Sequence, residues 1–211
     1  MIQYAISTNY EYYKQTLPRL ISSMKAAGIA GRKIRVYVGR SPFIKTVQTS
    51  YETHQFLQYG AYEHTALIGY LLKNSSPFTH LFLLHDTCEV GLNFSGLVAQ
   101  GLQFNVDAVS VNGGMCGFGL YSNSFLRKNQ ERILALKDCD KHTAMVAEGF
   151  LCRGEGAIVE YPGQEKYKTL GLMDIYSTGI PRLKEYYPQV DLYKYKANWG
   201  QTNPGTYIER L

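Results

Sequence analysis

Two hydrophobic periods follow each other at the start of the chain. Residues Gln3 to Thr8 alternate and are rich in β-forming side chains, which predicts a strand. Glu11 to Lys25 then carries the apolar stripe of a helix, formed by Tyr13, Leu17, Leu20, Ile21 and Met24. Pro18 lies within this stripe and is expected to kink or divide the helix. Because Lys33 to Val38 forms a second strand pattern, we predict a β-α-β unit with a parallel strand pair.

A continuous apolar run, Leu81 to Leu84, follows a second helical segment from Tyr62 to Lys73. A strand that is apolar on both faces belongs in the middle of a covered parallel sheet. His85 and Asp86 come directly after it and therefore lie at its carboxyl end, where open α/β sheets bind ligands. We expect the functional site at this point.

The remaining pattern is less regular but still alternates between strands and helices. It predicts a helix from Phe94 to Leu102, a strand from Ala108 to Asn112, a glycine-rich loop from Gly113 to Gly119, a helix from Ser124 to Leu136 and a strand from Ala157 to Glu160. Pro42 to Tyr59 is ambiguous, and the tyrosine-rich tail from Arg182 is expected to mix short helix with loop. The prediction is therefore one α/β domain over residues 1–211, with a mostly parallel Rossmann-like sheet flanked by helices.

Composition narrows the classes of protein that this pattern fits. The chain is 45% hydrophobic, and it contains no apolar run of the roughly 18 residues that a membrane span needs. The start of the chain lacks a secretory signal, and the four cysteines form no C-x-x-C pair, so we expect a soluble, cytoplasmic protein. The formal net charge is +5, but Lys and Arg are scattered, which argues against a nucleic-acid partner and suits a small phosphate-bearing ligand.

The residues after the apolar strand could hold a divalent cation. A Mg²⁺ or Mn²⁺ ion that bridges a diphosphate uses only one or two protein ligands, with oxygen or imidazole donors on a stiff element. Asp86 is the first candidate ligand, and His85 or Glu89 could supply the second. The alternative is that Asp86 caps the following turn and His85 is a hydrogen-bonded polar residue at a strand end.

The order of these elements, with Leu-Phe-Leu-Leu-His-Asp-Thr at 81–87 and Gly-Phe-Gly-Leu-Tyr at 117–121, resembles glycosyltransferases of the GT-A fold, viral members included. The resemblance covers roughly residues 3–160. It implies a nucleoside diphosphate sugar as donor, with UDP as the family preference, a carbohydrate or glycoprotein glycan as acceptor, and Mn²⁺ or Mg²⁺ as cofactor. The family's Asp-x-Asp signature is incomplete here, because His85-Asp86-Thr87 has one of the two aspartates.

The same resemblance implies which residues contact the nucleotide sugar. They are Ser7, Thr8, Asn9, Tyr10, Arg40, His64, Thr65, His85, Asp86, Gly117, Lys194 and Lys196. Tyr10 could stack on a pyrimidine, and Arg40 stands where relatives often have an acidic residue that reads the base. Each group also has a structural explanation: Thr8 or Asn9 as a helix N-cap, His64 as a packed histidine, and the glycines as turns.

Transfer also needs an enzyme carboxylate beside the anomeric carbon of the sugar. The resemblance points to Glu148, with Asp174 and Asp107 as further candidates. A non-catalytic nucleotide-sugar or glycan-binding module is the competing hypothesis, because the acidic signature is incomplete. A nucleotidyltransferase would need a glycine-rich basic loop after the first strand, which the segment from Ser7 to Tyr10 does not provide.

Overall fold

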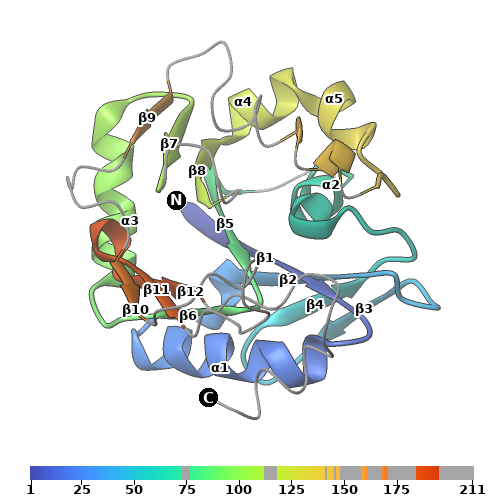
Figure 1. The fold of residues 1–211 in the computed structure, drawn as a ribbon, viewed down its shortest axis with the longest axis horizontal. Helices are drawn as coiled ribbons and strands as arrows, with labels where there is room; N and C mark the ends of the chain where they lie inside the picture. The colour runs from blue at the N-terminus through green and yellow to red at the C-terminus, as the bar shows by residue number, and fades with distance from the viewer. Residues whose placement is uncertain are drawn as a thin grey trace.

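A computed structural model gives the fold of the chain. It describes residues 1–72, 77–111, 118–140, 142–144, 146–147, 158–160, 168–170 and 184–194. In these ranges an eight-stranded sheet has the order β3-β4-β2-β1-β5-β8-β7-β9 (Figure 1). Its strands are β1 (Ile2–Asn9), β2 (Ile34–Gly39), β3 (Lys45–Gln48), β4 (Thr53–Phe56), β5 (His80–His85), β7 (Ala108–Ser110), β8 (Gly119–Ser122) and β9 (Ile158–Glu160).

Most strands of this sheet point in one direction. β1 pairs in parallel with β2 and with β5, β2 pairs in parallel with β4, and β7 pairs in parallel with β9. β3 is antiparallel to β4, and β8 is antiparallel to both β5 and β7. The predicted α/β class, the β-α-β unit and the mostly parallel sheet are therefore confirmed, with β3 and β8 as the reversed strands of the described sheet.

The apolar strand lies at the centre of the sheet, as its sequence predicts. β5 is hydrogen-bonded to β1 on one side and to β8 on the other, and Leu81 to Leu84 are all 0% exposed. Both faces of a central strand are covered, so a run of four apolar residues is needed there in place of alternation. This burial brings His85 and Asp86 to the edge of the sheet.

Helices cover both faces of the sheet. They are α1 (Tyr13–Ala26), α2 (Thr65–Leu71), α3 (Phe94–Gln100), α4 (Asn123–Lys128) and α5 (Gln130–Leu134), with the 3-10 turns η1 (Gly31–Lys33), η2 (Tyr62–His64), η3 (Gly101–Phe104) and η4 (Pro188–Val190). No helix within the described ranges has the length and apolar character that crossing a membrane requires.

Two details of the helices differ from the predicted pattern. Pro18 lies inside α1 without dividing it. The segment from Ser124 to Leu136 was predicted as one helix, but α4 ends before Asn129 and α5 begins after it. At this junction the side-chain amide and the backbone N–H of Asn129 both donate to the carbonyl of Phe125, at 3.0 Å and 3.1 Å.

Side-chain alternation along the central strands divides the core in two. Tyr4 and Ile6 of β1 belong to a cluster with α1, α3 and the second sheet, whereas Ala5 belongs to a cluster with α2, α4 and α5. α2 approaches the second of these faces closely at Gly69. A Cβ atom there would lie 2.3 Å from the ring of Tyr37, so only glycine permits this distance.

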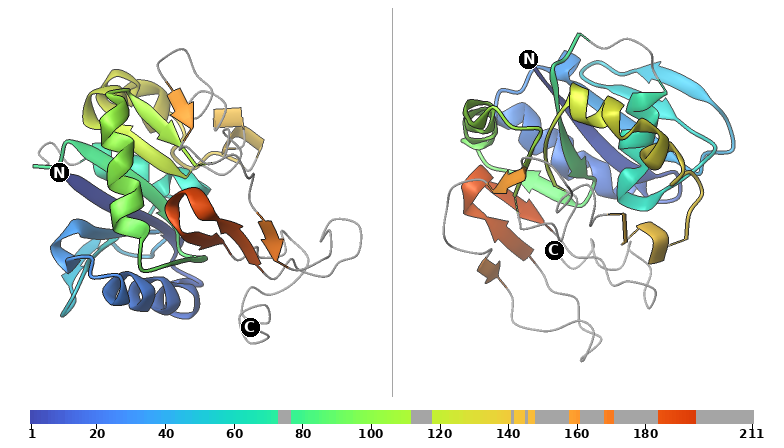
Figure 2. Two further views of the ribbon diagram at one scale, coloured as in Figure 1. Left: turned by 90° about the vertical axis from the view of Figure 1, so that its left-hand side faces the viewer. Right: turned by 90° about the horizontal axis from the view of Figure 1, so that it is seen from above.

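A second, antiparallel sheet forms from segments that are distant in the chain. Its order is β10-β11-β12-β6, with β6 (Cys88–Val90), β10 (Lys168–Leu170), β11 (Lys184–Tyr187) and β12 (Leu192–Lys194). η4, the turn between β11 and β12, contacts α3, and Figure 2 shows this end of the hairpin beside the helix. The expectation of short helix and loop after Arg182 is wrong for residues 184–187 and 192–194, which form strands on either side of η4. β12 pairs with its sequence neighbour β11 and also with β6, a partner that is distant in the chain.

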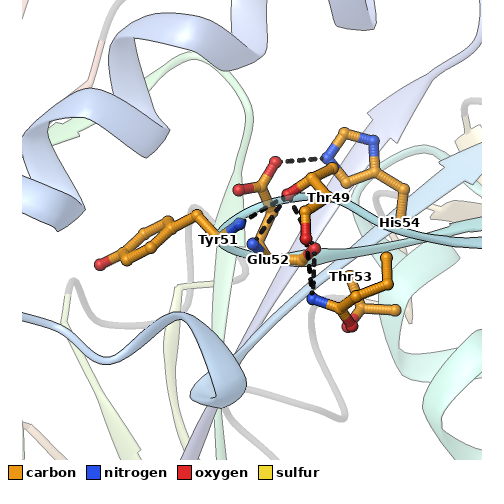
Figure 3. A network of polar contacts seen from close by, with 6 residues as sticks. Thr49, Tyr51, Glu52, Thr53 and His54 are labelled. Carbon is orange, nitrogen blue, oxygen red and sulfur yellow. Dashed lines mark hydrogen bonds and ion pairs between the residues drawn. The ribbon is translucent and has the colours of Figure 1, made fainter.

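The ambiguous segment from Pro42 to Tyr59 contains the β3–β4 hairpin. Its turn is held by the hydroxyl of Thr49, which accepts hydrogen bonds from the backbone N–H groups of Tyr51 (3.1 Å) and Glu52 (2.9 Å), as Figure 3 shows. The Glu52 carboxylate lies 2.8 Å from His54 Nε2. This hydroxyl turn carries no glycine or proline, which is why the sequence pattern did not indicate a hairpin.

The buried Tyr4 and the half-buried Tyr59 should make the fold sensitive to alkali. Burial raises the pKa of Tyr4 to about 12 and is the main cause that raises the pKa of Tyr59 to about 12. In the unfolded chain both phenols ionise near 10, so between about pH 10 and about pH 12 the unfolded state binds fewer protons than the folded state. Below about pH 10 these two phenols therefore leave the free energy of unfolding at its full value. Between about pH 10 and about pH 12 the free energy of unfolding should fall as the pH rises.

Urea unfolding at a series of pH values measures this effect. The expected midpoint falls through the alkaline range, and the fall is shallower in Tyr4→Phe, which removes one of the buried phenols. A midpoint that stays constant up to about pH 12 would contradict the burial of these tyrosines.

Candidate functional site

The sheet has a topological switch point between β1 and β5. From β1 the chain passes through α1 to β2 on one side, whereas β5 lies on the other side of β1 (Figure 1). Open α/β sheets bind ligands outside the carboxyl ends of the strands at such a point. The strand-end site is defined here as the residues at the carboxyl ends of β1, β2 and β5: Thr8, Asn9, Tyr10, Arg40, His85, Asp86 and Thr87.

Asp86 joins the end of β5 to β1 and α1. Its Oδ2 atom accepts hydrogen bonds from the hydroxyls of Thr8 and Thr16, each at 2.5 Å, and its backbone N–H donates to the Ser7 carbonyl at 3.2 Å. Both threonines are buried. The carboxylate therefore makes its hydrogen bonds backward to the first strand and helix, and not forward to the turn that it was considered to cap.

His85 contacts a lysine from the far end of the chain. Lys194 Nζ lies 2.7 Å from His85 Nδ1 and donates to Thr87 Oγ1 at 2.7 Å. Because an ammonium group can only donate, His85 Nδ1 accepts and the ring proton of the neutral imidazole lies on Nε2. Phe118 completes the group, with its ring centroid 4.6 Å from that of His85 and 5.1 Å from Lys194 Nζ.

The pairing of β12 with β6 explains how Lys194 reaches this point. β6 begins three residues after the end of β5, and Lys194 stands opposite Cys88 in the antiparallel ladder. Leu192, two residues earlier on the same face, is fully buried in the core beneath. Because β12 pairs with β6, Lys194 lies near the carboxyl end of β5 although it is distant in the sequence.

Ser7 faces away from the strand-end site. Its buried hydroxyl donates to the Glu63 carbonyl at 2.5 Å and accepts from the Ala66 N–H at 2.9 Å. These bonds attach β1 to the start of α2. The structure therefore corrects the expectation that Ser7 contacts the nucleotide: its side chain satisfies backbone groups inside the protein.

His64 and Thr65 are also part of the interior. His64 is fully buried, and its Nε2–H donates to the Ala144 carbonyl at 2.9 Å. The Thr65 hydroxyl donates to the Tyr62 carbonyl and accepts from the Ala61 N–H, each at 2.9 Å. Both side chains stabilise the entry into α2, which is the structural explanation given above for His64.

Asn9 and Tyr10 lie at the end of β1, where the sequence placed them. The Asn9 side chain accepts from the Glu11 N–H at 3.0 Å and so holds the turn that leads into α1. Tyr10 is half-buried, with its ring stacked on Tyr13 at 5.8 Å and edge-on to Phe43 at 5.6 Å. Tyr10 thus belongs to an aromatic cluster at this edge of the sheet.

Arg40 and Tyr62 form a strained pair beside the site. Both adopt left-handed backbone conformations, with φ values of 54° and 50°, which cost non-glycine residues of the order of 1 kcal/mol or more each. The Arg40 guanidinium lies 5.4 Å from the centroid of the Tyr62 ring, a cation–π geometry. Arginine and tyrosine are not residue types that indicate a left-handed backbone, so the sequence did not point to the position of Tyr62 beside the site.

The three predicted metal ligands do not form one cation site. Lys194 occupies the position at His85 Nδ1, and Asp86 Oδ2 already accepts two hydroxyls. Glu89 pairs with Tyr193 across the β6–β12 ladder and so projects from the opposite face to Lys194 and Cys88. Within the described ranges, no group of three or more His, Cys, Asp or Glu side chains could hold a metal ion. The contacts of these three side chains therefore do not bring them together as one set of metal ligands.

The structure describes only one of the predicted catalytic carboxylates, Asp107. Glu148, Asp174, Gly117 and Lys196 lie outside the described residues. Asp107 precedes β7 and accepts from the Ser122 hydroxyl at 3.2 Å, which puts it at the amino end of its strand and at the opposite edge of the sheet. Asp107 is thereby removed as a candidate.

Comparison with known proteins adds no identification. No family model matches the chain, and neither a curated protein nor a solved structure matches it.

Proposed function

We propose that this protein binds a nucleoside diphosphate sugar at the strand-end site and transfers the sugar to a carbohydrate hydroxyl. The observation that carries the proposal is the position of Lys194, which brings a positive charge to the carboxyl end of β5 beside His85 and Thr87. A switch point with a fixed cation and hydroxyl donors suits a diphosphate. The element order, together with the one aspartate that 85–87 shares with the family signature, supports a glycosyltransferase.

The site offers separate surfaces for the two halves of the donor. Lys194 and Thr87 present an ammonium and a hydroxyl at the end of β5, which suit the diphosphate. Arg40 and Tyr10 lie at the ends of the two neighbouring strands, β2 and β1, and offer a cation and an aromatic ring to the nucleoside. A uracil base is the family preference and is part of the proposal.

The transfer would exchange one bond at the anomeric carbon for another. The bond from this carbon to the diphosphate oxygen breaks, and its electron pair leaves with the diphosphate. The acceptor hydroxyl oxygen bonds to the carbon, and its proton passes to an enzyme carboxylate, for which Glu148 and Asp174 are the candidates. Positive charge at the site stabilises the departing diphosphate.

A binding module without turnover is the second candidate function. It is favoured by the state of Asp86, whose Oδ2 is already bound to two buried threonines. In that case the strand-end site would hold a nucleotide sugar, and the protein would have no catalytic carboxylate.

Donor binding and turnover distinguish these functions. We expect UDP-sugars to bind in calorimetry and to release UDP when a panel of carbohydrate acceptors is supplied. Glu148→Gln or Asp174→Asn should lower kcat by about 100-fold or more if that residue takes the proton, with the UDP affinity unchanged. Binding without release of UDP from any acceptor would favour the module, and absence of binding by any nucleoside diphosphate sugar would refute the proposal.

A further inference from the structure

We infer that the ammonium group of Lys194 takes the place of a divalent cation at the diphosphate, so that donor binding does not depend on metal. This inference rests on the proposed function and states how that site recognises its ligand. The sequence at the end of β5 suggests a metal site, but the contacts of its side chains do not form one. The inference follows from this difference.

Lys194 is held in a defined position. It contacts an imidazole nitrogen, a hydroxyl and an aromatic face, contributed by His85, Thr87 and Phe118. An ammonium group has three N–H donors, and the described residues take two of them. The third can be donated to a phosphate oxygen without breaking the other two contacts.

The charge of Lys194 has no acidic partner among the described residues. Its two hydrogen-bond acceptors, His85 Nδ1 and Thr87 Oγ1, carry no negative charge. Lys194 is half-buried, and an anion that binds beside it gains a charge-assisted hydrogen bond. The diphosphate of a bound ligand would bring a negative charge to this ammonium group.

A metal ion would compete with this lysine for the same atom. Coordination through His85 Nδ1 requires the lone pair that now accepts from Lys194, 2.7 Å away. A divalent cation there would also meet the positive charge of the ammonium. The Oδ2 atom of Asp86 is not available to that cation, because it accepts from Thr8 and Thr16.

The segment that carries Lys194 is fastened to the rest of the fold. Asp191 accepts from the Asn93 N–H at 3.0 Å and from the Tyr186 hydroxyl at 3.2 Å through its carboxylate. Its backbone carbonyl accepts from the Gly91 N–H at 2.7 Å. These bonds hold the turn before β12 against the start of α3, so the lysine is presented by a docked strand.

The test measures the binding of UDP and of inorganic pyrophosphate by calorimetry, in EDTA and in Mn²⁺. Wild-type protein should bind both in EDTA, and Mn²⁺ should strengthen binding by less than about tenfold. Lys194→Met should weaken both affinities by about tenfold or more, because it removes a charge-assisted hydrogen bond, whereas Lys194→Arg should retain most of the affinity.

Lys25→Met is the matched control. Lys25 is also a lysine above an aromatic ring, 5.9 Å from the centroid of Tyr51, but it lies in the last turn of α1, at the opposite edge of the sheet. Its loss should leave both affinities unchanged. Circular dichroism checks the fold of each variant. If Lys194→Met does not fold, Lys194→Gln replaces it, because the amide keeps hydrogen-bond donors toward His85 and Thr87 without the charge.

The outcomes separate this inference from the proposed function. A gain of about tenfold or more on adding Mn²⁺, or an unchanged affinity in the neutral Lys194 variants, overturns the inference and leaves the proposed function standing. A third outcome is that pyrophosphate binding depends on Lys194 while UDP and UDP-sugars bind no more tightly than pyrophosphate. This outcome supports the inference and refutes the nucleotide-sugar function. If neither probe binds the wild-type protein, both are refuted.

Discussion

Replacing Phe82 with alanine is expected to lower the free energy of unfolding by about 3–5 kcal/mol. Phe82 lies in the middle of β5 and is 0% exposed. Its ring is perpendicular to that of Phe94 at 5.4 Å and tilted to that of Tyr4 at 6.3 Å. The alanine variant leaves a cavity where strand, helix and aromatic neighbours meet, and the surrounding side chains cannot fill it without moving the sheet.

Urea unfolding followed by circular dichroism measures this loss. Phe104→Ala is the matched control, because Phe104 lies on η3 and is 38% exposed. This change should cost about 1 kcal/mol or less. Equal losses in the two variants would contradict the central position of β5, and with it the argument that places His85 and Asp86 at the strand end.

Replacing Asp86 with alanine is expected to cost about 1–3 kcal/mol of folding free energy, because the hydroxyls of Thr8 and Thr16 lose their acceptor. Both threonines are buried, so water does not readily replace the carboxylate. Asp86→Asn keeps an oxygen that can accept both hydroxyls and should cost about 1 kcal/mol or less. Urea unfolding of the two variants gives the comparison.

The same pair of variants distinguishes a structural role of Asp86 from metal binding. If the carboxylate serves to join β5 to β1 and α1, Asp86→Asn should bind UDP with an affinity within about threefold of wild type, with or without Mn²⁺. If Asp86 is the metal ligand that its position in the sequence suggests, the asparagine variant should lose a Mn²⁺-dependent part of the affinity while remaining folded. The second result would show that Asp86 binds a metal ion at the strand-end site.

The position of the strand-end site could be predicted from local pattern. Four apolar residues in a row, Leu81 to Leu84, require cover on both faces, and the first polar residues after them must then lie at a sheet edge. The identity of those residues was less informative. His85 and Asp86 suggested two metal ligands, but their partners in the fold are Lys194 and the two threonines.

Side-chain direction explains why other candidates did not reach the site. Ser7 and Thr8 are adjacent in β1, yet alternation sends the Ser7 hydroxyl to the start of α2 and the Thr8 hydroxyl to Asp86. His64 lies on a segment that also approaches the carboxyl edge, but its ring turns inward to Ala144. A residue type at a plausible position therefore does not establish which way it faces.

The sequence by itself determined the β-α-β start, the burial of β5 and the edge at which its polar residues emerge, because hydrophobic period and strand order act over short stretches of chain. Only the tertiary structure decided what those residues contact. Lys194 meets His85 across 109 positions, and Thr16 meets Asp86 across 70. Such contacts depend on which strand pairs with β6 and on which face each side chain takes, and both are settled by packing of the whole chain, which no local period records.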